Sequence, residues 1–141
     1  MHARRTSLRT TVALATMCFA LGSGLAAQKN RGPTDPAKVP RVKPEELQKL
    51  QAKAQVVLVD VRTPQAFAAG HLDGAVNIPA TDIETRAADL RRLAGTRRIV
   101  LYCSCAFEHS AADAAVRLAR LGVTKVSVLS GGYRGEEAHD T

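Results

Sequence analysis

Cysteine is scarce in this sequence, with three residues in 141. Cys18 lies near the N-terminus, and Cys103 and Cys105 are separated by a single residue. Two cysteines at this spacing do not make the disulfide framework of a small secreted fold. A structural zinc site is not expected either, because it needs four ligands and His109 is the only nearby third candidate. We therefore expect no metal and no cofactor, and we interpret Cys103 and Cys105 as reactive thiols.

The sequence also lacks a hydrophobic run long enough for a membrane span, which needs about 20 mostly apolar residues. The apolar stretch at residues 12–25 follows Arg4, Arg5 and Arg9, and small residues come after it. This order predicts a signal peptide at residues 1–27, of the general secretory or the twin-arginine type. We expect an exported protein, periplasmic or secreted, with no stable membrane insertion after the signal is removed.

The body of the chain has no excess of positive charge, although the formal net charge is +7. Residues 1–27 carry +3 and residues 28–43 carry +4, whereas residues 44–141 hold 12 basic and 12 acidic side chains. A nucleic-acid-binding domain usually presents a basic face of its own. We therefore do not expect nucleic acid as a partner.

Composition divides the chain into four parts, and no internal repeat is found. Residues 28–43 are rich in Pro, Gly and Lys without an apolar period, which predicts a flexible linker. Short apolar runs alternate with helical patterns over residues 44–135, and residues 136–141 form a polar tail. This alternation predicts an α/β domain with a mostly parallel sheet. The runs expected to form strands are residues 56–59, 75–78, 99–102 and 126–129.

Cys103 follows one of these predicted strands, and a helix is expected to begin at Ser110 after a short loop. Amide groups of the loop and the positive end of the helix both stabilise a thiolate, the reactive form of cysteine. A buried, inert cysteine is the simpler interpretation of a lone residue. The position between strand and helix favours a functional thiol.

Two further segments give the sequence a family resemblance: residues 57–62 (VLVDVR) and residues 70–79 (GHLDGAVNIP). With the Tyr102-Cys103 pair and the double glycine at Gly131-Gly132, they resemble the signature of the rhodanese family. The resemblance spans about residues 42–135. It implies a five-stranded parallel sheet flanked by helices on both faces. It also implies sulfur transfer through a persulfide on Cys103, with a small sulfur donor and a thiol acceptor as partners.

The loop departs from the family pattern where activity is decided. It is one residue longer, lacks the usual glycine, and has His109 where an arginine is expected before Ser110. His109 carries at most a partial charge near neutral pH, and Glu108 adds a negative one. We therefore expect no phosphatase activity and weak activity toward thiosulfate. The residues expected to form the substrate loop are Ser104, Ala106, Phe107, Glu108, His109 and Ser110, with Asp60 and Arg62 as a supporting pair.

The roles of the two cysteines stay open at this point. We predict that Cys103 is the nucleophile, and that Cys105 is more exposed, meets fewer donors and acts as a resolving thiol. The reverse remains possible, because the usual loop length counted back from Ser110 ends at Ser104, between the two. Two alternatives to sulfur transfer are a thiol–disulfide protein that uses both cysteines and a non-catalytic rhodanese-like binding module.

The export prediction has a direct test. We expect the mature protein to begin after Ala26, because Gly24-Leu25-Ala26 fits the small-x-small cleavage pattern, or after Ala27 as an alternative end. N-terminal sequencing of the exported form checks this. A mature chain that still begins at Met1 would contradict it.

Overall fold

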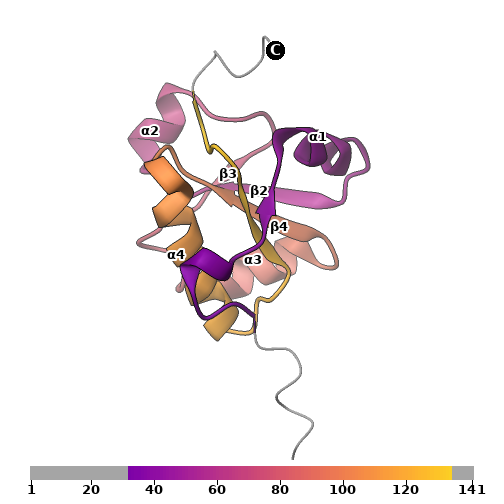
Figure 1. Ribbon diagram of the computed structural model, residues 1–141, viewed down its shortest axis with the longest axis vertical. Coiled ribbons are helices and arrows are strands. Elements are labelled where there is room, and N and C mark those ends of the chain that lie inside the picture. The colour runs from indigo at the N-terminus through magenta and orange to yellow at the C-terminus, as the bar shows by residue number, and fades with distance from the viewer. Residues whose placement is uncertain (1–31, 135–141) are drawn as a thin grey trace, which may run out of the picture.

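The computed structural model describes residues 32–134, which fold around one parallel sheet (Figure 1). All four strand pairings are parallel, in the order β1-β5-β4-β2-β3. The predicted α/β fold with five parallel strands is confirmed. In chain order the elements are η2 (Pro36–Lys38), β1 (Arg41–Val42), α1 (Pro44–Ala52), β2 (Val56–Asp60), α2 (Pro64–Ala69), β3 (Val76–Asn77), α3 (Ala87–Ala94), β4 (Arg98–Tyr102), η3 (Ala106–Glu108), α4 (His109–Arg120) and β5 (Val126–Leu129).

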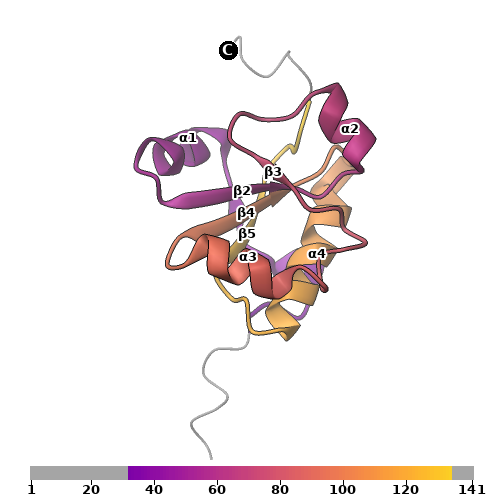
Figure 2. The same cartoon turned by 180° about the vertical axis from the view of Figure 1, so that it is seen from behind.

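Helices cover both faces of the sheet, with α1 on one side and α3 and α4 on the other (Figures 1 and 2). Side chains alternate along each strand, so β2 sends Val57 and Val59 to the α3–α4 side and Leu58 to the α1 side. The core on the α3–α4 side is the larger of the two. Burial on both faces explains why the central strands are continuous apolar runs.

The prediction of a flexible linker is wrong for residues 32–43, which are packed against the domain. η2 and β1 lie in this segment, and Val39 and Val42 are buried. β1 pairs with β5 at the other end of the domain sequence, so no local pattern reveals it. The predicted signal peptide, residues 28–31 of the linker and the tail lie outside the described residues.

The helices α3 and α4 begin without a side-chain cap. α3 begins at Ala87, after turns at residues 81–86 that contain the fully buried Ile83. α4 begins at His109, one residue before the expected start at Ser110, and Asp113 in it pairs with Arg117. Within residues 32–134, no helix combines the length and the apolar character that crossing a membrane requires.

The C-terminal segment is tied to the end of β4 at one point of close approach. The Tyr133 N–H donates to the Cys103 carbonyl at 2.8 Å. Gly132 has φ +59°, and a Cβ atom there would lie 2.2 Å from the same carbonyl oxygen. Only glycine fits this position without moving the backbone.

We expect Gly132→Ala to lower the free energy of unfolding by about 2–4 kcal/mol, from the left-handed backbone and the forced displacement together. Gly74→Ala is the matched control, because Gly74 also has a positive φ but a Cβ atom there would meet nothing within 4 Å. It should cost only about 1 kcal/mol. Urea unfolding of both variants measures the difference. Equal losses of unfolding free energy in the two variants would show that the Cys103 carbonyl leaves room for a Cβ atom at residue 132.

Candidate active site

A cavity of about 320 Å³ opens at the carboxyl end of the sheet, where ligands of parallel sheets bind. Both cysteines line it, together with Arg62 and the first turn of α4. The segments after β2, β3 and β4 thus meet at one place. The full lining is Val61, Arg62, Thr63, Ala66, Ala80, Cys103, Ser104, Cys105 and Ser110.

Cys103 sits directly after β4 and is only 2% exposed. Burial raises the pKa of its thiol, and the hydrogen bond that the thiol shares with the Cys105 sulfur raises it further. The backbone amides of Cys105 and Ala111 act in the opposite direction without outweighing the burial. Cys103 is therefore a protonated thiol near neutral pH.

Cys105 lies under the N-terminus of α4 and is partly exposed. The Ser110 N–H donates to its sulfur at 3.4 Å, and the Ser110 hydroxyl oxygen is 3.6 Å from the same atom. Burial alone would raise the pKa of this thiol. The hydrogen bonds from the Cys103 side chain and from the Ser110 amide and hydroxyl outweigh it, so the pKa is lowered. Cys105 is thus the thiol that ionises first.

The expectation that fewer hydrogen-bond donors surround the Cys105 sulfur than the Cys103 sulfur is wrong. The 3₁₀ turn η3 folds the loop back, so that Cys105, five residues before Ser110, comes to the helix terminus. Cys105 is the more exposed of the pair, as predicted. Which cysteine acts as the nucleophile stays a prediction.

The turn depends on two consecutive residues with left-handed backbone, Phe107 (φ 57°) and Glu108 (φ 54°). This conformation is unfavourable for residues other than glycine. The Glu108 carboxylate stabilises it by accepting the Gly131 N–H at 2.7 Å, and it lies 3.9 Å from the Arg41 guanidinium. Glu108 therefore does not line the cavity, and its effect on an anionic substrate stays a prediction.

His109 also faces away from the two cysteines. Its ring is 5.9 Å from the ring of Phe107, and both residues line a separate depression of about 380 Å³ with Arg41. Of the predicted substrate loop, Ser104 and Ser110 line the cysteine cavity. Ala106, Phe107, Glu108 and His109 do not, and the Phe107 side chain is 78% exposed.

The expected pair of Asp60 and Arg62 is present at the base of the cavity. Asp60 is fully buried and accepts from Arg62 Nε with both carboxylate oxygens at 3.0 Å. A further bond from Arg62 Nη2 at 2.6 Å completes the ion pair, and the hydrogen bonding with Asp60 raises the pKa of Arg62. The same guanidinium donates to the Gly70 carbonyl and stacks 4.1 Å above the ring of Tyr133.

Sequence reasoning missed part of the lining, namely Val61, Thr63, Ala66 and Ala80. These residues follow β2 and β3, so their position after strand ends was the available signal. Thr63 has a second role, since its hydroxyl oxygen accepts from Ala66 N–H at 3.3 Å and caps α2. Within residues 32–134, no three side chains of His, Cys, Asp or Glu converge as metal ligands.

The model of the rhodanese-like domain family matches residues 43–138. The chain belongs to this family. It is 36% identical over 93 residues to the thiosulfate sulfurtransferase GlpE of Pseudomonas putida. The aligned region covers 66% of this chain and 80% of the relative. The human single-domain sulfurtransferase TSTD1 matches with a TM-score of 0.60 and 26% identity, over 72% of this chain and 98% of its own.

A relative of another kind shares only the domain. The chain is 41% identical over 87 residues to the HTH-type transcriptional regulator Rv0324 of Mycobacterium tuberculosis. The match spans 62% of this chain but 37% of the regulator. The predicted family and fold are confirmed, and the relatives named sulfurtransferases support the expected enzyme class.

We expect Asp60→Ala to destabilise the domain by about 3–5 kcal/mol, because it leaves the Arg62 guanidinium buried without its partner. Asp89→Ala is the matched control, since Asp89 also pairs with arginines but is half exposed. Its loss should cost less than about 1 kcal/mol. Chemical unfolding compares the two. A small effect at Asp60 would mean that water replaces the carboxylate beside Arg62.

Proposed function

We propose that the protein is an exported sulfurtransferase that holds sulfur as a persulfide in the cavity of Cys103 and Cys105. The observation that carries the proposal is the pair of thiols in one cavity, of which one is favoured as thiolate and the other as thiol. Family membership and the relatives named sulfurtransferases support it. Export is supported only by the signal-like pattern of residues 1–27.

The contacts favour Cys105 as the thiol that takes sulfur first, rather than Cys103 as the sequence predicts. Cys105 is the more exposed residue, and its sulfur already accepts the Ser110 N–H. An anionic persulfide on Cys105 would keep this donor. Cys103 is nearly inaccessible and retains its proton, so it acts second, as a neighbouring thiol.

The reaction then has two steps. With thiosulfate as donor, the Cys105 thiolate attacks the outer sulfur, a new S–S bond forms, and sulfite leaves with the electron pair of the broken S–S bond. In the second step the thiolate of a small acceptor attacks the outer sulfur of the persulfide. Cys105 leaves as a thiolate, and the acceptor carries the sulfur away. No cofactor takes part in either step.

Thiosulfate is expected to be a weak donor. Among the residues that line the cavity, Arg62 is the only cation, and both Asp60 oxygens already bind it. A dianion approaching Cys105 therefore meets the Ser110 amide and hydroxyl but no free cation. Donors with less negative charge than thiosulfate should react faster.

A second candidate function follows from the position of the two thiols in one cavity. Cys103 can attack the inner sulfur of a Cys105 persulfide, which forms a Cys103–Cys105 disulfide and releases hydrosulfide. A protein that mainly does this is a thiol–disulfide protein. Intact mass after incubation with a donor separates the functions. A gain of one sulfur indicates transfer, a loss of two hydrogens indicates a disulfide, and an unchanged mass indicates a binding module.

The order of the two cysteines gives a testable prediction. Limiting iodoacetamide at mildly acidic pH should label Cys105 before Cys103. A lowered pKa keeps the Cys105 thiolate populated until the pH falls below that pKa, whereas labelling of Cys103 should rise only at alkaline pH. Peptide mass spectrometry identifies the labelled residue.

The variants extend this test to sulfur loading. Cys105→Ser should lose the mass gain of one sulfur, and Cys103→Ser should keep it. Ser104→Ala is the matched control, because Ser104 lines the same cavity without a reactive atom. Persulfide formation in Cys105→Ser but not in Cys103→Ser would return the nucleophile to Cys103.

A further inference from the structure

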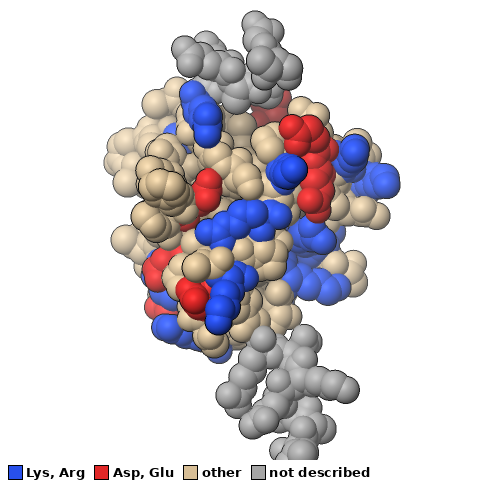
Figure 3. All heavy atoms as spheres, viewed as in Figure 1, with Lys and Arg blue, Asp and Glu red and all other residues tan. Residues whose placement is uncertain are grey.

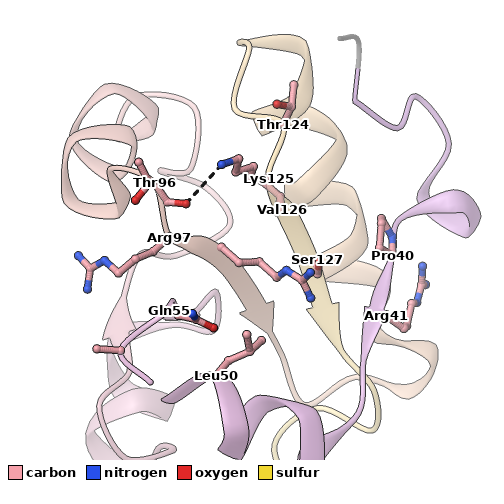
Figure 4. A pocket seen from close by; sticks show the side chains of 12 residues that line it. Pro40, Arg41, Leu50, Gln55, Thr96, Arg97, Thr124, Lys125, Val126 and Ser127 are labelled. Carbon is pink, nitrogen blue, oxygen red and sulfur yellow. Dashed lines mark hydrogen bonds between the residues drawn. The ribbon is translucent and has the colours of Figure 1, made fainter. Parts of the chain in front are cut away.

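A second hollow, of about 680 Å³, lies at the opposite end of the sheet from the cysteines, where the strands begin (Figure 4). It is bounded by β1, the end of α1, and the segments that lead into β4 and β5. We call it the amino-end groove. Its lining is Pro40, Arg41, Leu50, Ala54, Gln55, Thr96, Arg97, Arg98, Thr124, Lys125, Val126 and Ser127.

The groove is strongly basic, with four cations and no Asp or Glu in its lining. Two of the cations have carboxylate neighbours, since Arg98 pairs with Glu46 at 2.8 Å and Arg41 lies 3.9 Å from Glu108. Arg97 and Lys125 have none among residues 32–134, and they donate to backbone carbonyls, which do not cancel their charge. Lys and Arg side chains also form a band across the middle of the face in Figure 3.

The floor and walls of the groove add uncharged polar side chains. Ser127 on β5 lines the floor, and Figure 4 shows it on the strand between Lys125 and Arg41. Gln55, Thr96 and Thr124 add further polar groups along the walls.

We propose that the amino-end groove binds an extended acidic segment of a partner protein. Charge complementarity carries the choice of an acidic ligand. The arrangement of the cations favours an extended one, because Arg97 and Arg41 lie on opposite sides of the groove and do not converge on one point (Figure 4). A single small anion would need convergent donors, whereas successive carboxylates fit cations that are spread apart.

The inference is independent of the chemistry at the cysteines. The groove lies at the start of the strands, the cysteine cavity lies beyond their carboxyl ends, and the two share no lining residue. Arg41 of the groove lies 3.9 Å from Glu108 of the cysteine loop, and variants of Arg97 and Lys125 leave that contact unchanged. An acidic segment bound in the groove would leave Cys105 open to a donor. A failure of sulfur loading therefore does not affect this proposal, and a failure of peptide binding does not affect the proposed function.

Fluorescence anisotropy with a labelled peptide of six glutamates tests the proposal on the full chain. We expect binding at low salt that weakens as salt rises, and no binding of a peptide of six glutamines. The double variant Arg97→Glu/Lys125→Glu should bind the acidic peptide at least about tenfold more weakly, because attraction becomes repulsion at two positions. The variant Arg97→Gln/Lys125→Gln, which removes both charges without reversing them, should weaken peptide binding less. It keeps the proposal testable if the double glutamate variant does not fold.

The control is Arg86→Glu, which changes one charge at the other end of α3 and outside the groove. At an ionic strength of about 0.15 M, where the Debye length is about 8 Å, it should leave peptide affinity within about twofold, because Arg86 is outside the lining of the groove and pairs with Asp89. No binding at low salt, equal binding to all variants, or a preference for a single-stranded oligonucleotide with the same dependence on Arg97 and Lys125 would each overturn the proposal.

Discussion

The buried ion pair of Asp60 and Arg62 fixes the geometry of the carboxyl end of the sheet. Asp60 ends β2, and its backbone carbonyl accepts from Ile78 N–H and from the Asn77 side chain, which brings the segment after β3 alongside. Through Arg62 the same residue reaches the Gly70 carbonyl and the ring of Tyr133. A buried charge must be paired and hydrogen-bonded, so the Asp60 carboxylate, through Arg62, holds the segments of Gly70 and Tyr133 at this edge of the sheet.

The reactivity of the two cysteines results from two opposing effects of their surroundings. Burial disfavours a thiolate at Cys103, which belongs to the core, whereas an amide donor at a helix N-terminus favours one at Cys105. Two cysteines separated by a single residue therefore differ in the protonation state that their surroundings favour: a thiol at Cys103 and a thiolate at Cys105. The left-handed backbone of Phe107 and Glu108 is unfavourable in itself, and Glu108 offsets that cost by binding Gly131 and Arg41.

Much of the fold could be predicted because its central strands are buried on both faces and read as short apolar runs. β1 could not be predicted, because a strand of two residues shows no hydrophobic period. It forms a strand because it pairs with β5. For the site, the position of Cys103 after a strand and the pair of Asp60 with Arg62 were visible in the sequence. The path of the loop was not, because non-glycine residues seldom adopt the left-handed conformation that Phe107 and Glu108 share. That path decides where Glu108, His109 and Cys105 point.

The charge of the chain has a different meaning in the structure than in the sequence. Residues 44–141 carry equal numbers of basic and acidic side chains, which argues against a basic face when only totals are counted. The fold separates those charges in space, since Arg97 and Lys125 lie just before β4 and β5 while Glu108 and Asp60 are bound near the carboxyl end. A balanced total is therefore compatible with a strongly basic groove. Because that groove and the cysteine cavity lie at opposite ends of the parallel strands, a partner in the groove would leave access to the thiols open.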